Sequence, residues 1–146
     1  MNYSMHLYTK CLTCAGLIPF IACALLLSTG VESVPWLGSV STLLSVYGLV
    51  IASFLAGSHW GQHLDQQNML RPWLAYSSNV CAIALWLGFS LATFTVFIWL
   101  LMGVFLLLLG VDIVLFRAKF ITGNYVKMRV IVTVIVVLSL WVAGVS

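Results

Sequence analysis

The chain has 146 residues, of which 63% are hydrophobic and only 6% are charged. A soluble globular domain carries about 25% charged residues, because most of its surface must face water. Six basic and three acidic side chains cannot cover such a surface, which excludes a soluble enzyme and a disulfide-stapled secreted domain. Six basic residues are also too few to follow a phosphate backbone, so a nucleic-acid binder is excluded. The composition predicts an all-α integral membrane protein.

The first two predicted spans are uninterrupted apolar runs. A hydrocarbon core about 30 Å thick takes roughly 20 apolar residues in helical form. The first span covers residues 11–29 and ends before Gly30. A loop with Pro35 follows, and the second span covers residues 36–61. The polar run that comes next, from Gln62 to Asn68, predicts a return to water.

The third and fourth spans come from one long apolar run. No charged residue occurs from 72 to 116, and a single helix of that length would be about 65 Å long, twice the membrane thickness. The run must therefore fold back. Gly88, Ser90, Thr93 and Thr95 gather in its middle, which predicts a turn at 88–95, a third span at 72–89 and a fourth at 95–116.

The fifth span covers residues 125–144 and is rich in β-branched residues. In water this composition would favour a strand, but a lone strand in lipid would leave its backbone groups without hydrogen bonds, so a helix is predicted. The sequence shows no internal repeat and no second domain. We expect one five-helix transmembrane domain over residues 1–146.

The basic residues predict the orientation of the five spans. All of them fall on one side of the predicted membrane, before span one, between spans two and three, or between spans four and five: Lys10, Arg71, Arg117, Lys119, Lys127 and Arg129. The positive-inside rule then predicts a cytoplasmic N-terminus and an external C-terminus. The N-terminal residues resemble a signal peptide, but we expect them to stay as the first span, and they lack the Arg-rich pattern of an organellar transit peptide. This favours the bacterial inner membrane.

Small residues recur at helical spacing near the end of span two. Ser53, Gly57 and Gly61 are each four residues apart, and such a stripe lets another helix backbone approach closely. We therefore expect helix packing at this stripe.

Two histidines lie on another face of the same helix. His59 and His63 are four residues apart, and neutral imidazole is a common ligand of zinc, copper and iron. Cys11 and Cys14 form a Cys-x-x-Cys pair at the start of span one, and the predicted orientation places it at the same membrane surface. A metal site is one reading. The other is that His59 and Trp60 anchor the helix at headgroup level, with the cysteines as small apolar side chains.

Asp112 is the one acid inside an apolar run, and buried ionisable residues are usually paired. Arg129 is the predicted partner, with Lys127 as the second candidate, because both follow a short loop. Asn79 is expected about halfway into the hydrocarbon, where its amide needs a hydrogen-bond partner. A polar cluster at the cytoplasmic end is predicted from six residues of three spans: His59, Trp60, His63, Asp112, Tyr125 and Arg129.

Several strings resemble a known family. They are residues 16–20 (GLIPF), 53–61 (SFLAGSHWG), Asp112 and 125–129 (YVKMR). They are similar to strings in a family of small bacterial inner-membrane proteins that includes the mitochondrial transmembrane protein 69. The match covers about residues 11 to 142. The resemblance implies the same set of spans and no known activity.

The function is constrained mainly by absent motifs. The sequence has no recognisable Ser-His-Asp spacing, phosphate loop or His-Glu-x-x-His, so the balance is against an enzyme. We expect a cofactor-free accessory or lipophilic-ligand-binding bundle whose partner is the lipid bilayer, with another membrane protein or a second copy as further candidates. One alternative is a small metal- or haem-binding redox protein using His59, His63, Cys11 and Cys14, and another is an oligomeric small-molecule transporter. The loose similarity to tryptophan-rich translocator proteins adds porphyrin and sterol as ligand classes to screen.

Overall fold

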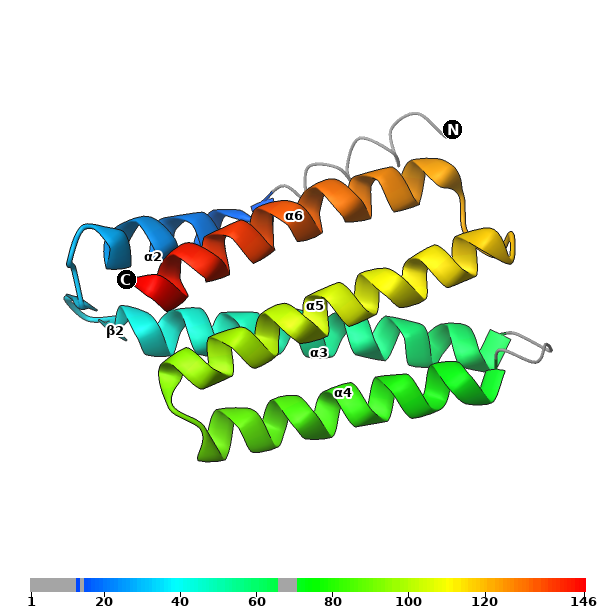
Figure 1. The fold of residues 1–146 in the computed structure, drawn as a ribbon, viewed down its shortest axis with the longest axis horizontal. Coiled ribbons are helices and arrows are strands. Elements are labelled where there is room, and N and C mark those ends of the chain that lie inside the picture. Colours follow the sequence, from blue (N-terminus) through cyan, green and yellow to red (C-terminus); the bar gives the residue numbers. More distant parts are fainter. Residues whose placement is uncertain (1–12, 14, 66–70) are drawn as a thin grey trace.

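The computed structural model describes residues 13, 15–65 and 71–146 (Figure 1). In these ranges five helices carry the fold, with one short two-stranded sheet, so the all-α prediction is confirmed. The helices are α2 (Ile18–Ser28), α3 (Val40–Asp65), α4 (Arg71–Leu91), α5 (Phe94–Arg117) and α6 (Gly123–Val145).

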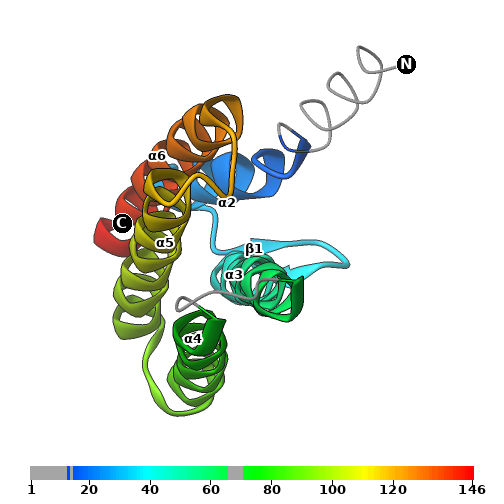
Figure 2. The same ribbon diagram turned by 90° about the vertical axis from the view of Figure 1, so that its right-hand side faces the viewer.

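The helices run roughly side by side along one axis (Figure 1). Seen from the end, α3 and α5 lie in the middle, with α2 and α6 on one side and α4 on the other (Figure 2). α3 packs against α2, α4 and α5, and α6 packs against α2 and α5. The middle helices therefore hold most of the interior, and any buried site must involve them.

Four of the described helices are long and apolar enough to cross a membrane, by length and composition: α3, α4, α5 and α6. α2 has 11 residues and is only about 16 Å long, shorter than the predicted first span. Residues 16 and 17 form a turn before it, and Pro19 lies in its first turn. Proline fits there because the first N–H groups of a helix have no partner inside the helix.

The turn between α4 and α5 is shorter than predicted. It consists of Ala92 and Thr93, whereas a turn was expected over residues 88–95. Gly88 lies inside α4 at a close helix contact, where an added Cβ would be 2.2 Å from Leu100 Cδ2. Ser90 also remains helical, and its hydroxyl donates to the Trp86 carbonyl of the same helix at 2.8 Å. Both residues are typical of turns, but here they lie in α4, and Gly88 allows the close contact with α5.

A hairpin connects α2 to α3. Strand β1 (Ser33–Val34) pairs antiparallel with β2 (Gly38–Ser39), with Ser33 opposite Ser39. Trp36 at the hairpin tip has a φ of 69° and is fully exposed. The second predicted span therefore begins as helix at Val40 rather than at residue 36, because the hairpin uses the residues between.

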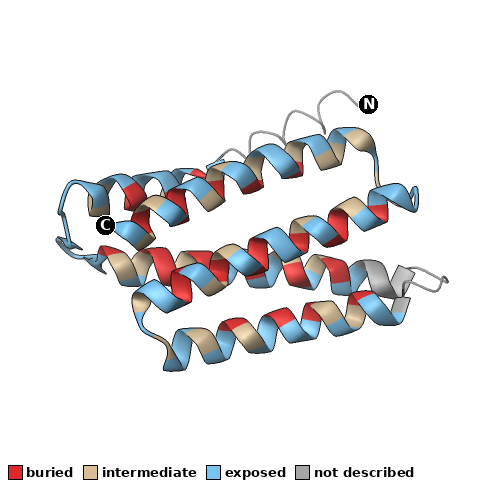
Figure 3. Ribbon diagram, in the orientation of Figure 1, coloured by how far each residue is buried: buried red, intermediate tan, exposed pale blue. Residues whose placement is uncertain are grey.

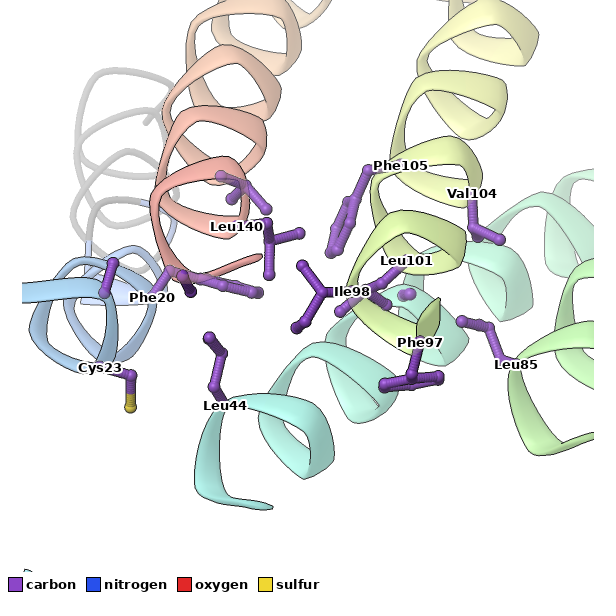
Figure 4. Packing of buried hydrophobic residues seen from close by; sticks show 14 of the residues in the cluster. Phe20, Cys23, Leu44, Leu85, Phe97, Ile98, Leu101, Val104, Phe105 and Leu140 are labelled. Carbon is purple, nitrogen blue, oxygen red and sulfur yellow. The ribbon is translucent and has the colours of Figure 1, made fainter. Parts of the chain in front are cut away.

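The main apolar core lies toward the hairpin end of the bundle. Buried residues line the inward faces of the helices (Figure 3). Phe20, Leu44, Ile98, Leu101 and Leu140 meet there from α2, α3, α5 and α6 (Figure 4). The outward faces carry many large apolar side chains, which suits contact with lipid. The opposite end of the same interior contains charged groups.

Candidate functional site

Three ionisable side chains meet inside the bundle around Asp112. Asp112 Oδ1 lies 2.9 Å from His59 Nε2, and its Oδ2 accepts a 2.7 Å hydrogen bond from Arg129 Nε. Asp112 is 0% exposed, His59 1% and Arg129 6%. The predicted pair of Asp112 and Arg129 is present, and His59, predicted in the same polar cluster but not as a partner of Asp112, is the third member. We call these residues the triad.

Helical periodicity places each member of the triad on a buried face. On α3, His59 follows Ala52 and Ala56 at spacings of four and three residues, and all three are buried. Arg129 begins a similar buried row on α6, and Asp112 lies within one on α5. Residues at these spacings share one helix face. The same spacing in the sequence was therefore a signal that His59 points inward.

The triad leaves one nitrogen without a partner. A carboxylate only accepts hydrogen bonds, so His59 Nε2 is the donor in this contact. In the part of the chain that the structure describes, Nδ1 is buried without a hydrogen-bond partner. The same holds for Thr133 Oγ1, one helical turn beyond Arg129. Buried polar groups without partners are rare, and each calls for an explanation.

A cavity of about 240 Å³ lies beside the triad, bounded by α2, α3, α5, α6 and the turn before α2. Its apolar wall includes Phe20, Ile51, Phe54, Phe105, Val132 and Val136. Thr13, Arg129 and Thr133 are the polar side chains in the lining. Arg129 thus reaches both Asp112 and the cavity, and it connects the triad to an apolar space.

The other predicted cluster residues that the structure describes differ in exposure. Trp60 and Asn79 are exposed, and Asn79 Nδ2 donates to the Ala75 carbonyl of its own helix at 3.1 Å. Tyr125 is half-buried one helical turn before Arg129 on the same face of α6, near the triad. The structure therefore brings together His59, Asp112 and Arg129 out of the larger predicted set. The burial of His59 does not fit the alternative in which it anchors the helix at headgroup level.

The proposed metal ligands are located only in part. Cys11, Cys14 and the side chain of His63 lie outside the described residues. In the ranges that are described, no three His, Cys, Asp or Glu side chains gather as a metal site would require. Cys23 and Cys81 are buried free thiols.

The small-residue stripe does not pack as expected in the described part of the chain. Ser53, Gly57 and Gly61 are exposed, and a Cβ added at either glycine would meet no described atom within 4 Å. α3 instead buries Ala52 and Ala56. The hydroxyl of Ser78, on α4, donates to the Ala56 carbonyl at 2.6 Å. Helix contact therefore uses alanines one position before the stripe.

Fold and site together define a helical bundle of membrane-protein type with a buried triad beside an apolar cavity. The chain belongs to a family of proteins of unknown function, DUF3429, whose model matches residues 5–145. The expectation of a family without a known activity is confirmed. No curated protein and no solved structure matches the chain.

Proposed function

We propose that the protein binds a lipophilic ligand in the cavity between α2, α3, α5 and α6. The observation that carries this proposal is an apolar cavity of about 240 Å³ with a buried arginine, Arg129, in its wall. An apolar cavity of about 150 Å³ is enough to hold benzene. Ligand sites are typically apolar with a few placed polar groups that set the orientation of the ligand.

The position of Arg129 supports this function further. It lies about 9 Å along α6 from Gly123, so the polar wall of the cavity is near one end of the bundle. A lipophile with a polar end would place that end at Arg129 and its chain among Phe20, Phe54 and Val136. A lipophilic ligand would be dissolved in the same bilayer that the apolar outer faces of the helices contact.

The membrane setting is part of the same proposal. We place the protein in the bacterial inner membrane, with the bilayer as its partner, the N-terminus cytoplasmic and the C-terminus outside. Arg117, Lys119 and Lys127 support this orientation, because the α5–α6 connection lies at the opposite end of the bundle from the hairpin and Ser146 (Figure 1). Kinship with the mitochondrial transmembrane protein 69 rests on the sequence strings described above.

Photolabelling of the purified full chain in mild detergent tests the function. Three probes with a diazirine in the chain serve: palmitic acid, its methyl ester and hexadecane. We expect at least one probe to label peptides that contain the cavity residues Phe54 and Val132, and excess unlabelled lipophile to suppress the labelling.

A matched pair of variants makes the test specific. Val132→Phe fills the cavity, whereas Val134→Phe adds the same ring at an exposed position of the same helix. Labelling should fall in Val132→Phe and persist in Val134→Phe. The proposal is wrong if no probe labels the cavity peptides, or if both variants keep the labelling of the unmodified chain.

A further inference from the structure

The hydrogen-bond donors of Arg129 are only partly used. A guanidinium carries five N–H groups and no acceptor. Nε donates to Asp112 Oδ2, which accounts for one of the five. Arg129 is more than nine-tenths buried, and it lines the cavity. The guanidinium can therefore offer further N–H donors to a group in the cavity.

Thr133 adds a second unused group to the same wall. It follows Arg129 by four residues, so the two side chains share one face of α6. Thr133 is 1% exposed and lines the cavity, and its hydroxyl has no partner among the described residues. A threonine in a helix can bond its own i−4 carbonyl, but this one does not. Arg129 and Thr133 thus both present hydrogen-bond donors to one apolar space, and the Thr133 hydroxyl has no described acceptor.

The charge of the site limits what it accepts. Asp112 and Arg129 carry opposite charges at a hydrogen-bonding distance, so the pair is neutral as a whole. Arg129 is the one ionisable side chain in the described lining of the cavity. A carboxylate placed there would be an uncompensated charge in apolar surroundings, and a cation would face the guanidinium. Both arrangements cost far more than burying a neutral group that is hydrogen-bonded.

We infer that the ligand is a single-chain lipophile whose polar end is an uncharged carbonyl oxygen, as in an ester, a ketone or a quinone. The carbonyl accepts hydrogen bonds from Arg129 and Thr133, and the chain occupies the apolar part of the cavity. The separate charges of a zwitterionic phospholipid headgroup would be uncompensated there in the same way. This inference rests on the proposed function and names the class of its ligand.

A competition assay tests the inferred class of ligand. It uses the photoreactive probe that labels the cavity most strongly. The competitors are methyl palmitate, palmitate at a pH where it is ionised, hexadecane and a phosphatidylcholine. We expect methyl palmitate to compete about tenfold more strongly than hexadecane, because hydrogen bonds to a charged donor are among the stronger ones. Palmitate and phosphatidylcholine should both compete more weakly than the ester.

Thr133→Val separates recognition from folding, because valine matches the shape of threonine and removes only the hydroxyl. We expect this variant to lose about fivefold in competition by methyl palmitate and to keep its competition by hexadecane. Thr95→Val, at an exposed threonine near the start of α5, is the matched control and should change neither value. A thermal unfolding scan of each variant verifies that the bundle is intact.

The outcomes separate the two levels of the proposal. If hexadecane competes as well as the ester, or if ionised palmitate or phosphatidylcholine competes better, the inferred ligand class is wrong although the cavity still binds lipophiles. Equal loss of ester and hexadecane competition in Thr133→Val would also contradict it. If no probe had labelled the cavity, the proposed function itself would have failed first.

Discussion

Asp112 is the residue on which the polar interior of this bundle depends. Its two carboxylate oxygens have different partners from different helices, His59 and Arg129, and it is fully buried. Taking charges out of water is expensive, and the attraction between them compensates only when the geometry is good and the remaining groups are hydrogen-bonded. The short distances to both partners meet the first of these requirements.

Replacing Asp112 by alanine should destabilise the bundle strongly. The substitution leaves Arg129 buried without a counter-charge, and breaking a buried pair in this way costs about 3–5 kcal/mol. Unfolding of the purified protein in detergent by heat or denaturant measures the loss. Glu32→Gln, at an exposed acid in the loop after α2, is the control and should stay within about 0.5 kcal/mol. Equal stability of both variants would show that the triad is not structural.

The helices are joined by apolar contacts toward the hairpin end of the bundle and by the charged triad toward the other end. Near the hairpin, aromatic and aliphatic side chains interlock, as in the edge-to-face contact of Phe20 and Phe105 with centroids 5.8 Å apart. Further along, the triad joins α3, α5 and α6. The cavity lies between these two regions, where α2 begins after the turn at residues 16 and 17 and leaves space that α6 and α3 do not fill.

Two glycines of α3 predict opposite effects of the same substitution. A Cβ at Gly48 would lie 2.3 Å from Cδ2 of Leu101, which is fully buried, so the core must shift. Gly48→Ala should therefore destabilise by about 1–3 kcal/mol. Gly57 has nothing within 4 Å among the described residues, and alanine favours a helix over glycine by up to about 1 kcal/mol. Gly57→Ala should be neutral or stabilising.

The same unfolding assay compares the two glycine variants. Because both positions lie on one helix and receive the same methyl group, the difference between them reports packing rather than helix propensity. A larger loss at Gly57 than at Gly48 would contradict the helix packing described for α3.

The sequence predicted helices better than it predicted contacts between them. Apolar run length was enough for helices at α3 to α6, because lipid leaves few alternatives for a backbone. The turn between α4 and α5 was predicted too long, since glycine marks both turns and close helix contacts, and only the position of Leu100 shows that Gly88 belongs to a contact. Likewise, the charges of Asp112 and Arg129 predicted their pairing, but the third partner depended on which face of α3 turns inward.

For the whole molecule, the distribution of charge and apolar surface is consistent with one orientation in a bilayer. Exposed Trp73, Trp86 and Leu138 lie on outward faces, where soluble proteins would carry charge. Among the described residues, the buried charged side chains Asp112 and Arg129 pair with each other inside the bundle. Arg117, Lys119 and Lys127 lie near the connection between α5 and α6, and Arg71 begins α4.

Accessibility of engineered cysteines tests that orientation in bacterial cells. In a chain whose native cysteines are replaced by alanine, Ser146→Cys should react with a membrane-impermeant maleimide added outside intact cells, and Lys119→Cys should react only after lysis. Both positions are exposed in the structure, so neither is hidden by the fold. The reverse pattern would place the basic connection outside and overturn the assigned orientation.

The triad also has a consequence for how the chain is made. His59 is synthesised 53 residues before Asp112, and Arg129 comes 17 residues after Asp112. When α5 enters the membrane, the imidazole of His59 has therefore been synthesised, but the guanidinium of Arg129 has not. A chain that ends before Arg129 would therefore leave the buried Asp112 without the guanidinium that balances its charge.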